Sequence, residues 1–369
     1  MKRVRSFLVG VLEVGAGIVF LALAHELVLR FLPVAWAPTV QGPTATHPIQ
    51  RYQPNQSFTW SLGWNFYVVV RGRTNAQGFV SDYDYDATES KPLIAVVGDS
   101  MVEALMVPHA ETLTGRLQAM LKGSGRAYAI AQSGSPLTQY VAYAAHACET
   151  YRPQRLVVVV VGNDFDESIY DHRLRDGIYH LYPRADGGFD YKLTPLPPPS
   201  LLARVARHSA LALYLARNVG ITQVLLNMGI SLARAEDSNR YVGNTPADAS
   251  VRRVAEGEKV MAWFLDVLPG AACLAPPKIV IVVDAIRPQI YDDESLAAAR
   301  LSYFGRMRAN LMSQARARGF VVVDMEEAMR ADYAGAHQAF EFPTDAHWNS
   351  HAHAVAAAAV RNALAEWPP

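Results

Sequence analysis

The sequence predicts an α/β fold in which helices cover both faces of a doubly wound parallel sheet. Five short runs are almost wholly apolar and rich in β-branched residues, as expected of strands buried on both faces: 93–97, 128–131, 156–161, 278–283 and 320–323. Helical patterns separate most of these runs, for example over residues 112–121, 140–151 and 301–318. Strands that alternate with helices in this way indicate parallel pairing with right-handed crossovers.

The N-terminal segment predicts a membrane anchor. Lys2, Arg3 and Arg5 precede an apolar stretch over residues 7–24, in which Glu13 is the single charged residue. A helix of this length spans roughly 27 Å, close to the thickness of a bilayer core. Because basic flanks remain in the cytoplasm, we expect a single-pass inner-membrane protein whose remaining chain is extracytoplasmic, in the periplasm.

A cleaved signal peptide is the alternative to an anchor, since Ala22-Leu23-Ala24 places small residues where a peptidase would cut. The apolar stretch is long for a signal core, and apolar residues resume at 27–29, which favours an uncleaved anchor. We therefore expect three parts: an anchor over residues 1–32, a linker and N-terminal extension over 33–90, and a sheet domain over 91–369.

Residues 166–277 are expected to form an insertion, because the interval between the third and fourth predicted strands is too long for one crossover. The interval holds a hairpin candidate with strands over residues 177–182 and 189–193. It also holds two predicted helices, over residues 200–218 and 249–267. We interpret this insertion as a cap over the site.

Composition excludes several classes of protein. Apolar residues make up 51% of the chain and charged residues 18%, so the composition is not that of a disordered protein. Lys plus Arg and Asp plus Glu each number 34, and no basic stripe is present, which argues against nucleic-acid binding. Cys148 and Cys273 are the only cysteines, too few for a disulfide scaffold and without the Cys-x-x-Cys spacing of zinc or redox sites.

Residues with catalytic potential follow the predicted strands. Ser100 follows the first strand, Gly134 lies after the second, and Asn163 follows the third. Asp345 and His347 precede the last helical pattern. Chemistry in open parallel sheets lies beyond the carboxyl ends of the strands, so we expect these five residues at one edge of the sheet.

This set has the composition of an acyl-transfer site. The Ser100 hydroxyl would be the nucleophile, His347 the base that accepts its proton, and Asp345 the carboxylate that orients the imidazole. The oxyanion hole would consist of the backbone N–H groups of Ser100 and Gly134 and the side-chain amide of Asn163. The set therefore predicts ester hydrolysis or acyl transfer through an acyl-enzyme.

Each residue also has a structural interpretation. Ser100 with Glu103 fits a capping box, while the glycine and the asparagine fit a turn and a helix cap. His347 and His351 lie four residues apart, which would place two metal ligands on one helix face. We prefer the catalytic interpretation, because these residue types would otherwise follow successive strands in this order by accident.

At these positions the sequence resembles the SGNH (GDSL-type) hydrolase superfamily. The resemblance spans residues 92–369 and rests on an ordered set of motifs: Gly98-Asp99-Ser100, Gly134, Asn163 and Asp345/His347. It implies a flavodoxin-like three-layer α/β/α sandwich with a five-stranded parallel sheet, and no cofactor. It also implies a nucleophile, an orienting acid, a base and two further oxyanion donors at Ser100, Asp345, His347, Gly134 and Asn163.

The sequence departs from the superfamily pattern near the base. The usual spacing is Asp-x-x-His, whereas one residue separates Asp345 from His347, and Trp348 follows. This Asp-x-His-Trp form resembles a bacterial membrane-anchored subgroup and the alginate-type polysaccharide O-acetyltransferases. In those transferases the pair precedes the serine; here it follows, as in ordinary esterases. Val102 excludes the Gly-x-Ser-x-Gly elbow of α/β-hydrolases.

The sequence therefore predicts an extracytoplasmic serine esterase that acts on an acylated glycan or a small ester. The alternatives are a polysaccharide O-acetyltransferase of the same fold, a non-catalytic carbohydrate-binding or assembly subunit, and a metal-assisted hydrolase. The expected partners are the acylated carbohydrate or small ester, the inner membrane, and proteins of exopolysaccharide modification. We expect no nucleic acid, no metal and no cofactor.

Overall fold

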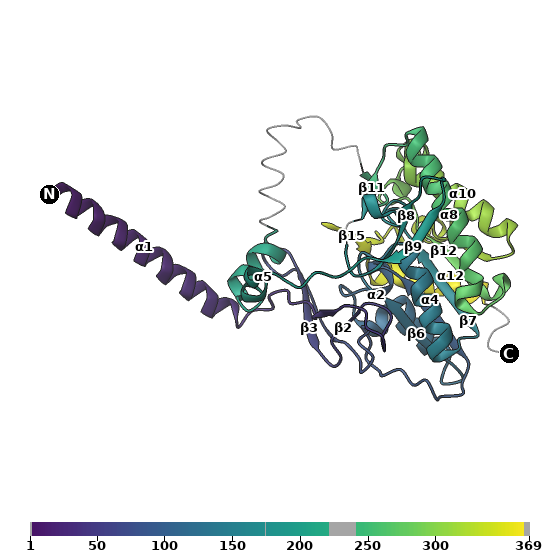
Figure 1. The fold of residues 1–369 in the computed structure, drawn as a ribbon, viewed down its shortest axis with the longest axis horizontal. Helices are drawn as coiled ribbons and strands as arrows, with labels where there is room; N and C mark the ends of the chain where they lie inside the picture. Colours follow the sequence, from purple (N-terminus) through teal and green to yellow (C-terminus); the bar gives the residue numbers. More distant parts are fainter. Residues whose placement is uncertain (1, 174, 221–240, 365–369) are drawn as a thin grey trace. The chain divides into compact units, whose positions relative to one another are not determined.

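The computed structural model describes residues 2–173, 175–220 and 241–364, with side chains from residue 6 onward (Figure 1). The chain divides into two compact units. The smaller unit comprises Met1–Ala37, Phe58–Arg71 and Pro198–Glu236, and the larger unit comprises Pro38–Ser57, Gly72–Pro197 and Asp237–Pro369. The division predicted from the sequence, at residues 32 and 90 with an insertion over 166–277, stays a prediction.

A five-stranded parallel sheet forms the centre of the larger unit, as predicted. Its strand order is β13-β12-β7-β5-β6, and every neighbouring pair is parallel. The strands are β5 (Leu93–Gly98), β6 (Arg126–Ala131), β7 (Arg155–Val160), β12 (Ile279–Val283) and β13 (Val321–Asp324). Each lies within two residues of the run that predicts it.

The strand order places a topological switch point in the middle of the sheet. The chain passes from β5 to β6 on one side, and then returns to β7 on the other side of β5. Crossovers therefore leave in opposite directions from the carboxyl ends of β5 and β7, the position at which open α/β sheets bind their ligands. The segments that carry Ser100 and Asn163 begin at this switch point.

Helices cover both faces of the sheet and complete the three layers (Figure 1). In one layer α4 (Leu137–Tyr151) packs against α8 (Val251–Ala272), which packs against α10 (Tyr303–Ala317). In the other layer α12 packs against both α3 and α11. The remaining helices of the larger unit are α2 (Ser100–Glu103), α3 (Leu113–Met120), α9 (Asp293–Ala299), α11 (Met325–Ala336) and α12 (Ser350–Ala363).

Two predicted helices begin slightly later than the periodicity suggests, because a polar side chain caps each one. Thr112 Oγ1 accepts a hydrogen bond from Gly115 N at 3.1 Å, and α3 starts one residue after the cap. Ser302 Oγ accepts one from Gly305 N at 3.2 Å before α10. Both caps satisfy backbone donors that lack a partner within the helix.

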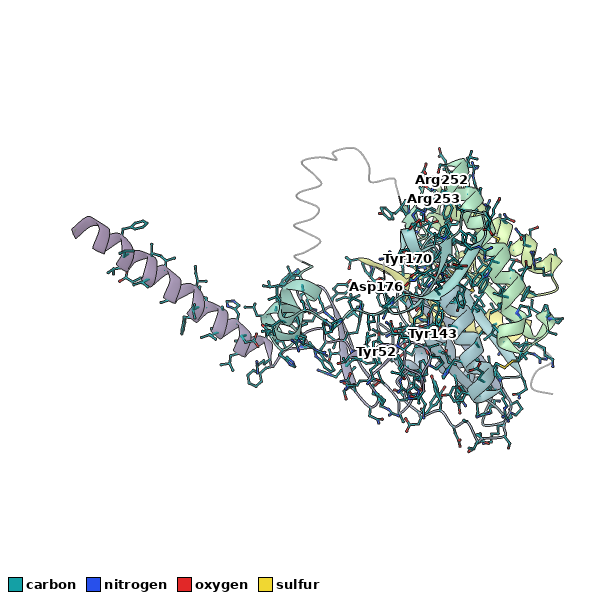
Figure 2. The ribbon with its side chains drawn as sticks, viewed as in Figure 1. Tyr52, Tyr143, Tyr170, Asp176, Arg252 and Arg253 are labelled. Carbon is teal, nitrogen blue, oxygen red and sulfur yellow. A yellow bond between two sulfur atoms is a disulfide. The ribbon has the colours of Figure 1, made fainter. Side chains whose placement is uncertain are left out.

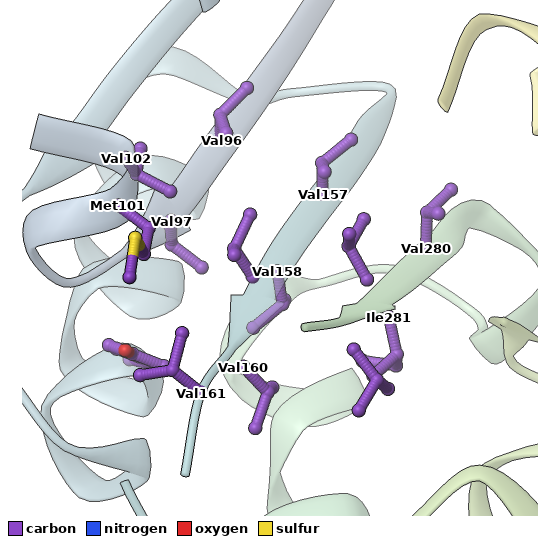
Figure 3. Close-up of a cluster of buried hydrophobic side chains, with 14 of the residues drawn as sticks. Val96, Val97, Met101, Val102, Val157, Val158, Val160, Val161, Val280 and Ile281 are labelled. Carbon is purple, nitrogen blue, oxygen red and sulfur yellow. The ribbon is translucent and has the colours of Figure 1, made fainter. Parts of the chain in front are cut away.

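Branched aliphatic side chains fill the space on both faces of the sheet (Figure 3). Val97, Val158 and Ile281 lie on three adjacent strands, and each is fully buried. Met101 and Val102 on α2 belong to the same cluster. Burial of one such side chain contributes about 1.5–3 kcal/mol to folding, so the core holds the first turn after β5 in place.

A disulfide joins Cys148 on α4 to Cys273 at the end of α8, with 5.9 Å between the two Cα atoms. The cysteines are 125 residues apart in the chain. The two cysteines are too few for a disulfide scaffold, as the sequence indicated, but they form one disulfide with each other. The bridge ties the last helix of the predicted insertion to a helix of the sheet domain.

The predicted insertion contains the expected hairpin, formed by β8 (Tyr179–Pro183) and β9 (Phe189–Leu193). The helix expected over residues 200–218 is instead broken into α5 (Leu201–Ala206), α6 (Ala210–Leu213) and the π-helical segment η3 (Tyr214–Asn218). The break falls where Ser209 Oγ accepts a hydrogen bond from Ala212 N at 3.1 Å and starts a new helix. Residues 221–240 lie outside the described residues.

Short elements complete the described chain. The two-stranded pairs are β1 (Val40–Gln41) with β2 (Arg51–Tyr52), β3 (Ser57–Leu62) with β4 (Val68–Arg73), β10 (Tyr241–Val242) with β11 (Thr245–Pro246), and β14 (Glu341–Phe342) with β15 (Asp345–Trp348). Single 3-10 turns occur at His109–Glu111, Tyr170–His172, Pro276–Lys278 and Gln289–Tyr291.

The smaller unit is organised around α1 (Lys2–Leu29), whose segment Ser6–Leu29 is long and apolar enough to cross a membrane. The apolar helix predicted at the N-terminus is therefore present; it continues past the apolar stretch over residues 7–24 and ends within the anchor expected over residues 1–32. Asn218 connects the parts of this unit that follow α1. Its side chain accepts a hydrogen bond from Ala35 N at 3.0 Å and donates one to Ser61 Oγ at 2.7 Å.

Candidate active site

Ser100 lies at the carboxyl end of β5, where α2 begins. The residue that caps α2 is Asp99, whose carboxylate accepts a hydrogen bond from Met101 N at 2.9 Å. The Ser100 hydroxyl donates to the other oxygen of Asp99 at 3.2 Å. The capping-box interpretation of Ser100 is therefore wrong, because a neighbouring carboxylate performs that function and leaves the hydroxyl outside the helix ladder.

Asp345 and His347 form a hydrogen-bonded pair on β15. His347 Nδ1 contacts Asp345 Oδ1, and the same carboxylate oxygen accepts the His347 backbone N–H at 3.0 Å. Burial opposes charge on the imidazole, but the bond to Asp345 and the negative charges of Asp345 and Asp99 outweigh it and raise the pKa of His347. Contact with Asp345 through Nδ1 leaves Nε2 as the atom for proton transfer.

The structure brings the segment of His347 against the segment of Ser100. Trp348 N donates a hydrogen bond to Met101 Sδ at 3.4 Å, so the residues next to each catalytic candidate touch. The charge of Asp99, which bonds the Ser100 hydroxyl, also acts on His347. Although 247 positions separate Trp348 from Met101 in the chain, the two halves of the candidate site are neighbours.

Asp284 and Arg287, which both follow β12, hold the segment of His347 in place. Asp284 accepts a hydrogen bond from the buried Trp348 indole at 2.8 Å and pairs with Arg287 at 2.8 Å. Arg287 also donates to the Ala346 carbonyl, between the acid and the base, at 2.9 Å. Neither residue was among those predicted from the sequence. The signal for Asp284 is its position directly after the predicted strand at 278–283, because functional residues in open parallel sheets lie beyond the carboxyl ends of the strands.

The histidines near the C-terminus have separate partners. His351 Nε2 contacts Asp332 Oδ2 at 2.6 Å, and the buried His353 accepts a hydrogen bond from Leu113 N at 3.1 Å. His347 lies on β15 and His351 on α12, so the two do not share a helix face. Among the described residues, no group of three or more His, Cys, Asp or Glu side chains is placed to hold a metal ion.

The loop after β6 holds Gly134 in the left-handed region, with φ of 72°. Ser133, the residue before it, is bound on both sides. Its N–H donates to Glu103 at 3.1 Å, its hydroxyl also contacts Glu103, and its carbonyl accepts from Arg175. The carbonyl and the following N–H of a trans peptide point in opposite directions, so Arg175 sets the direction of the Gly134 N–H.

Two buried tyrosines support the same loop (Figure 2). The Tyr143 hydroxyl lies 2.9 Å from Ser135 Oγ. The Tyr52 hydroxyl bonds Glu103; burial first of all, and then the Glu103 charge, raise the pKa of Tyr52. From the sequence, Glu103 was predicted only as part of a cap, and Tyr52 and Arg175 were not predicted, because none of the three directly follows a predicted strand.

Asn163 follows β7, and its side-chain amide donates a hydrogen bond to Glu167 Oε1 at 3.0 Å. Burial raises the pKa of Glu167 to about 7, although the bond from Asn163 acts in the opposite direction. This bond uses one of the two amide hydrogens. The predicted role of Asn163 as an oxyanion donor rests on the second hydrogen and stays a prediction.

Asp164, the next residue, has a structural role. It is fully buried and accepts hydrogen bonds from Val161 N at 2.8 Å and from the Tyr140 hydroxyl at 3.0 Å. These bonds close the turn at the end of β7 and fix the backbone that carries Asn163. The Asp164 side chain therefore stabilises the turn after β7 and has no place in the proposed acyl transfer.

Comparison with protein families agrees with this arrangement. Residues 277–369 match the model described as the SGNH hydrolase-like domain of the acetyltransferase AlgX. The matched part, about a quarter of the chain, contains β12, β13 and the Asp345/His347 pair. This part of the chain is thus similar to an SGNH hydrolase-like domain, which supports the class of ester-acting hydrolases or acyltransferases. The subgroup with an Asp-x-His-Trp motif stays a prediction. No curated protein matches the chain.

Several solved structures resemble the fold. LAE5, an alpha/beta hydrolase enzyme from the metagenome of Lake Arreo, is 12% identical over 76% of this chain and 98% of its own, with a TM-score of 0.42. A GDSL-like lipase from Bacteroides thetaiotaomicron is 9% identical over 74% and 88%, with a TM-score of 0.35. A two-domain esterase (CEX) active on acetylated mannans is 10% identical over 75% and 49%, with a TM-score of 0.38. At these values the likenesses carry no argument about substrate.

Proposed function

We propose that this protein is an extracytoplasmic, membrane-anchored serine enzyme that removes or transfers the acyl group of an acylated glycan or small ester. One observation carries the proposal. The His347/Asp345 pair lies beside the segment of Ser100, at the switch point of an SGNH-type sheet. A serine, an oriented imidazole and a carboxylate at such an edge are the components of acyl-enzyme chemistry.

In the first half-reaction the Ser100 oxygen attacks the acyl carbonyl while His347 Nε2 takes the hydroxyl proton. Negative charge then builds on the carbonyl oxygen, where the N–H groups of Ser100 and Gly134 and the Asn163 amide would donate hydrogen bonds. The bond to the leaving alkoxide breaks, and His347 gives its proton to that alkoxide. The product is an acyl ester of Ser100.

In the second half-reaction an acceptor hydroxyl attacks the acyl-enzyme while His347 takes its proton. The Ser100–acyl bond breaks, and Ser100 recovers the proton from His347. Water as the acceptor gives hydrolysis, whereas a sugar hydroxyl gives transfer, and the two reactions share every residue of the site. We favour hydrolysis, because the serine precedes the Asp/His pair in the chain, as in ordinary esterases.

Transfer of an acetyl group to a polysaccharide is the second candidate function. The matched family model carries the name of an acetyltransferase, which supports this acceptor. Partners in exopolysaccharide modification would then supply the donor. The Cys148–Cys273 bridge supports the extracytoplasmic location of either reaction, since disulfides persist mainly in oxidising compartments.

A fluorophosphonate probe tests the proposal, because it labels only an activated serine. The full chain in detergent should be labelled on Ser100, as mapped by peptide mass spectrometry, and the Ser100→Ala variant should not be labelled. Aryl acetate turnover, measured with and without an oligosaccharide acceptor, separates hydrolysis from transfer. A folded protein that is not labelled at Ser100 would instead be the non-catalytic carbohydrate-binding subunit.

A further inference from the structure

The smaller unit exposes large apolar side chains outside α1. Phe31 is 83% exposed, Leu202 78% and Trp64 71%. These residues come from three separate segments: the turn that follows α1, the β3–β4 hairpin and α5. Other exposed apolar residues in the same segments are Leu32, Tyr67, Leu201 and Val205. A water-soluble protein seldom exposes so many large apolar side chains within one small unit.

These segments are joined to the carboxyl end of α1. The Glu26 carboxylate accepts hydrogen bonds from Ser209 Oγ at 2.8 Å, Ala210 N at 3.1 Å and Leu211 N at 2.9 Å. The first turn of α6 is therefore attached to the last turns of α1. The hairpin is attached in turn, because the Tyr214 hydroxyl donates to the Trp64 carbonyl at 2.8 Å.

The position of α1 indicates how deep in a bilayer these exposed apolar side chains would lie. The apolar segment ends at Leu29, and Phe31 follows two residues later. At 1.5 Å per residue, Phe31 lies about 3 Å beyond the span. With α1 as a membrane span, Phe31 and the segments bonded to the end of α1 would be at the level where a bilayer meets water.

Charge in these segments also fits a lipid surface. Residues 30–37, 58–71 and 198–220 contain no Asp or Glu. They contain Arg30, Arg71, Arg204, Arg207 and Arg217, together with four tryptophan or tyrosine residues at Trp36, Trp60, Trp64 and Tyr67 in the first two segments. Apolar side chains with arginines and aromatic rings, without acidic residues, are typical of segments that lie in the membrane interface.

We propose that the smaller unit lies in the interfacial layer of the bilayer that α1 crosses. Phe31, Trp64, Leu202 and Val205 enter the boundary between headgroups and acyl chains, about 5–10 Å deep, and the exposed Arg71 and Arg204 face lipid phosphates. This interfacial surface rests on α1 as a membrane span and is independent of the chemistry at Ser100. Its occupant is lipid rather than a second protein.

The test uses the full chain in phosphatidylcholine/phosphatidylglycerol vesicles. The described residues contain no free cysteine, so a single new cysteine can carry an environment-sensitive dye. Leu202→Cys probes the proposed surface. Val251→Cys is the matched control, because Val251 is an aliphatic residue in the first turn of another helix and is 88% exposed. Leu12→Cys reports whether α1 crosses the bilayer.

We expect the dye at position 202 to be quenched by lipids that carry a nitroxide near the headgroup more strongly than by lipids with a deep nitroxide. The dye at 251 should be quenched by aqueous iodide and by neither lipid. The dye at 12 should respond most to the deep nitroxide. Addition of Val205→Glu to Leu202→Cys should shift the dye emission to the red and restore iodide quenching.

Two results would overturn the inference while the membrane anchor stands. In the first, position 12 reports deep insertion but position 202 is as accessible to iodide as position 251. In the second, position 202 is protected from iodide but is not quenched by either lipid, which means that protein covers it. Neither result depends on fluorophosphonate labelling of Ser100, so the proposed function is tested separately.

Discussion

Strand β5 and helix α5 have similar sequences and opposite surroundings. The strand reads Leu-Ile-Ala-Val-Val-Gly, and all six of its residues are buried. The helix reads Leu-Leu-Ala-Arg-Val-Ala, and none of its residues is buried. Apolar composition thus shows which side chains avoid water, but not what covers them. Helices on the two faces of the sheet cover β5, and we infer that lipid covers α5.

The comparison extends to the two units. In the larger unit the sheet carries a site whose polar groups bind one another, as Asp345 binds His347 and Glu103 binds Ser133. In the smaller unit the polar bonds of Glu26 attach one element to another. Changes in the first unit should therefore alter chemistry, whereas changes in the second should alter membrane contact.

The largest expected effect is at Ser100. Ser100→Ala should lower kcat by on the order of 10⁶-fold, because no nucleophile remains. The free energy of unfolding should change little, since Asp99 rather than Ser100 caps α2. Aryl ester turnover and chemical denaturation measure the two effects. Residual turnover of more than a few per cent would show that another group is the nucleophile.

The next effect concerns the base and its acid. Asp345→Asn should lower kcat by about 10⁴-fold, because the imidazole loses the carboxylate that orients it. In the unchanged protein kcat/KM should rise with pH, since only neutral imidazole accepts the serine proton. The midpoint of this rise should lie above pH 6.5, because Asp345 and Asp99 raise the pKa of His347 despite burial.

The pH profile of the variant provides the control. Without the Asp345 charge, burial lowers the pKa of His347, so the midpoint of the remaining activity should move to lower pH. His351 has its own carboxylate, Asp332, and His351→Gln should leave the profile unchanged. If His351→Gln shifts the midpoint of the pH profile and Asp345→Asn does not, His351 rather than His347 is the base.

Asn163→Ala should lower kcat by about 10²- to 10³-fold, or roughly 2.7–4 kcal/mol, with little change in KM. The reason is that the amide would bind charge that exists only in the transition state. Glu167→Gln is the matched control, because glutamine can still accept the 3.0 Å bond from Asn163. A defect confined to KM would show that Asn163 contacts the ground state only.

Loss of the disulfide should affect stability but not chemistry. Replacement of both Cys148 and Cys273 by serine should reduce the free energy of unfolding by about 2–5 kcal/mol, because the bridge closes a loop of 125 residues. Fluorophosphonate labelling of the folded variant should persist. Urea denaturation with and without reductant makes the measurement, and equal stability in both conditions would contradict the expectation.

The smallest effects sharpen the comparison of β5 with α5. Val97→Ala should cost about 2 kcal/mol, because the side chain is fully buried in the core of the larger unit. Leu202→Ala should change the free energy of unfolding by less than about 0.5 kcal/mol, since the side chain is exposed. Denaturation in detergent compares the two. A cost at Leu202 as large as that at Val97 would indicate protein packing around α5.

The sequence by itself determined the sheet and the order of its candidate residues. Each apolar run became a strand, because a run without alternation marks a segment that is covered on both faces. The position of Ser100 directly after the first run was therefore enough to place it at the edge of the sheet. The N-terminal helix was equally predictable, since its apolar length exceeds that of an ordinary buried helix.

Tertiary structure alone decided which side chains bind one another. Asp99 caps α2 in place of Ser100, and Trp348 meets Asp284 and Met101 across the fold. Ser209 divides a helix that periodicity makes continuous. Hydrophobic periodicity reports the burial of each position along its own element, whereas a hydrogen bond between distant residues depends on which elements the fold brings together.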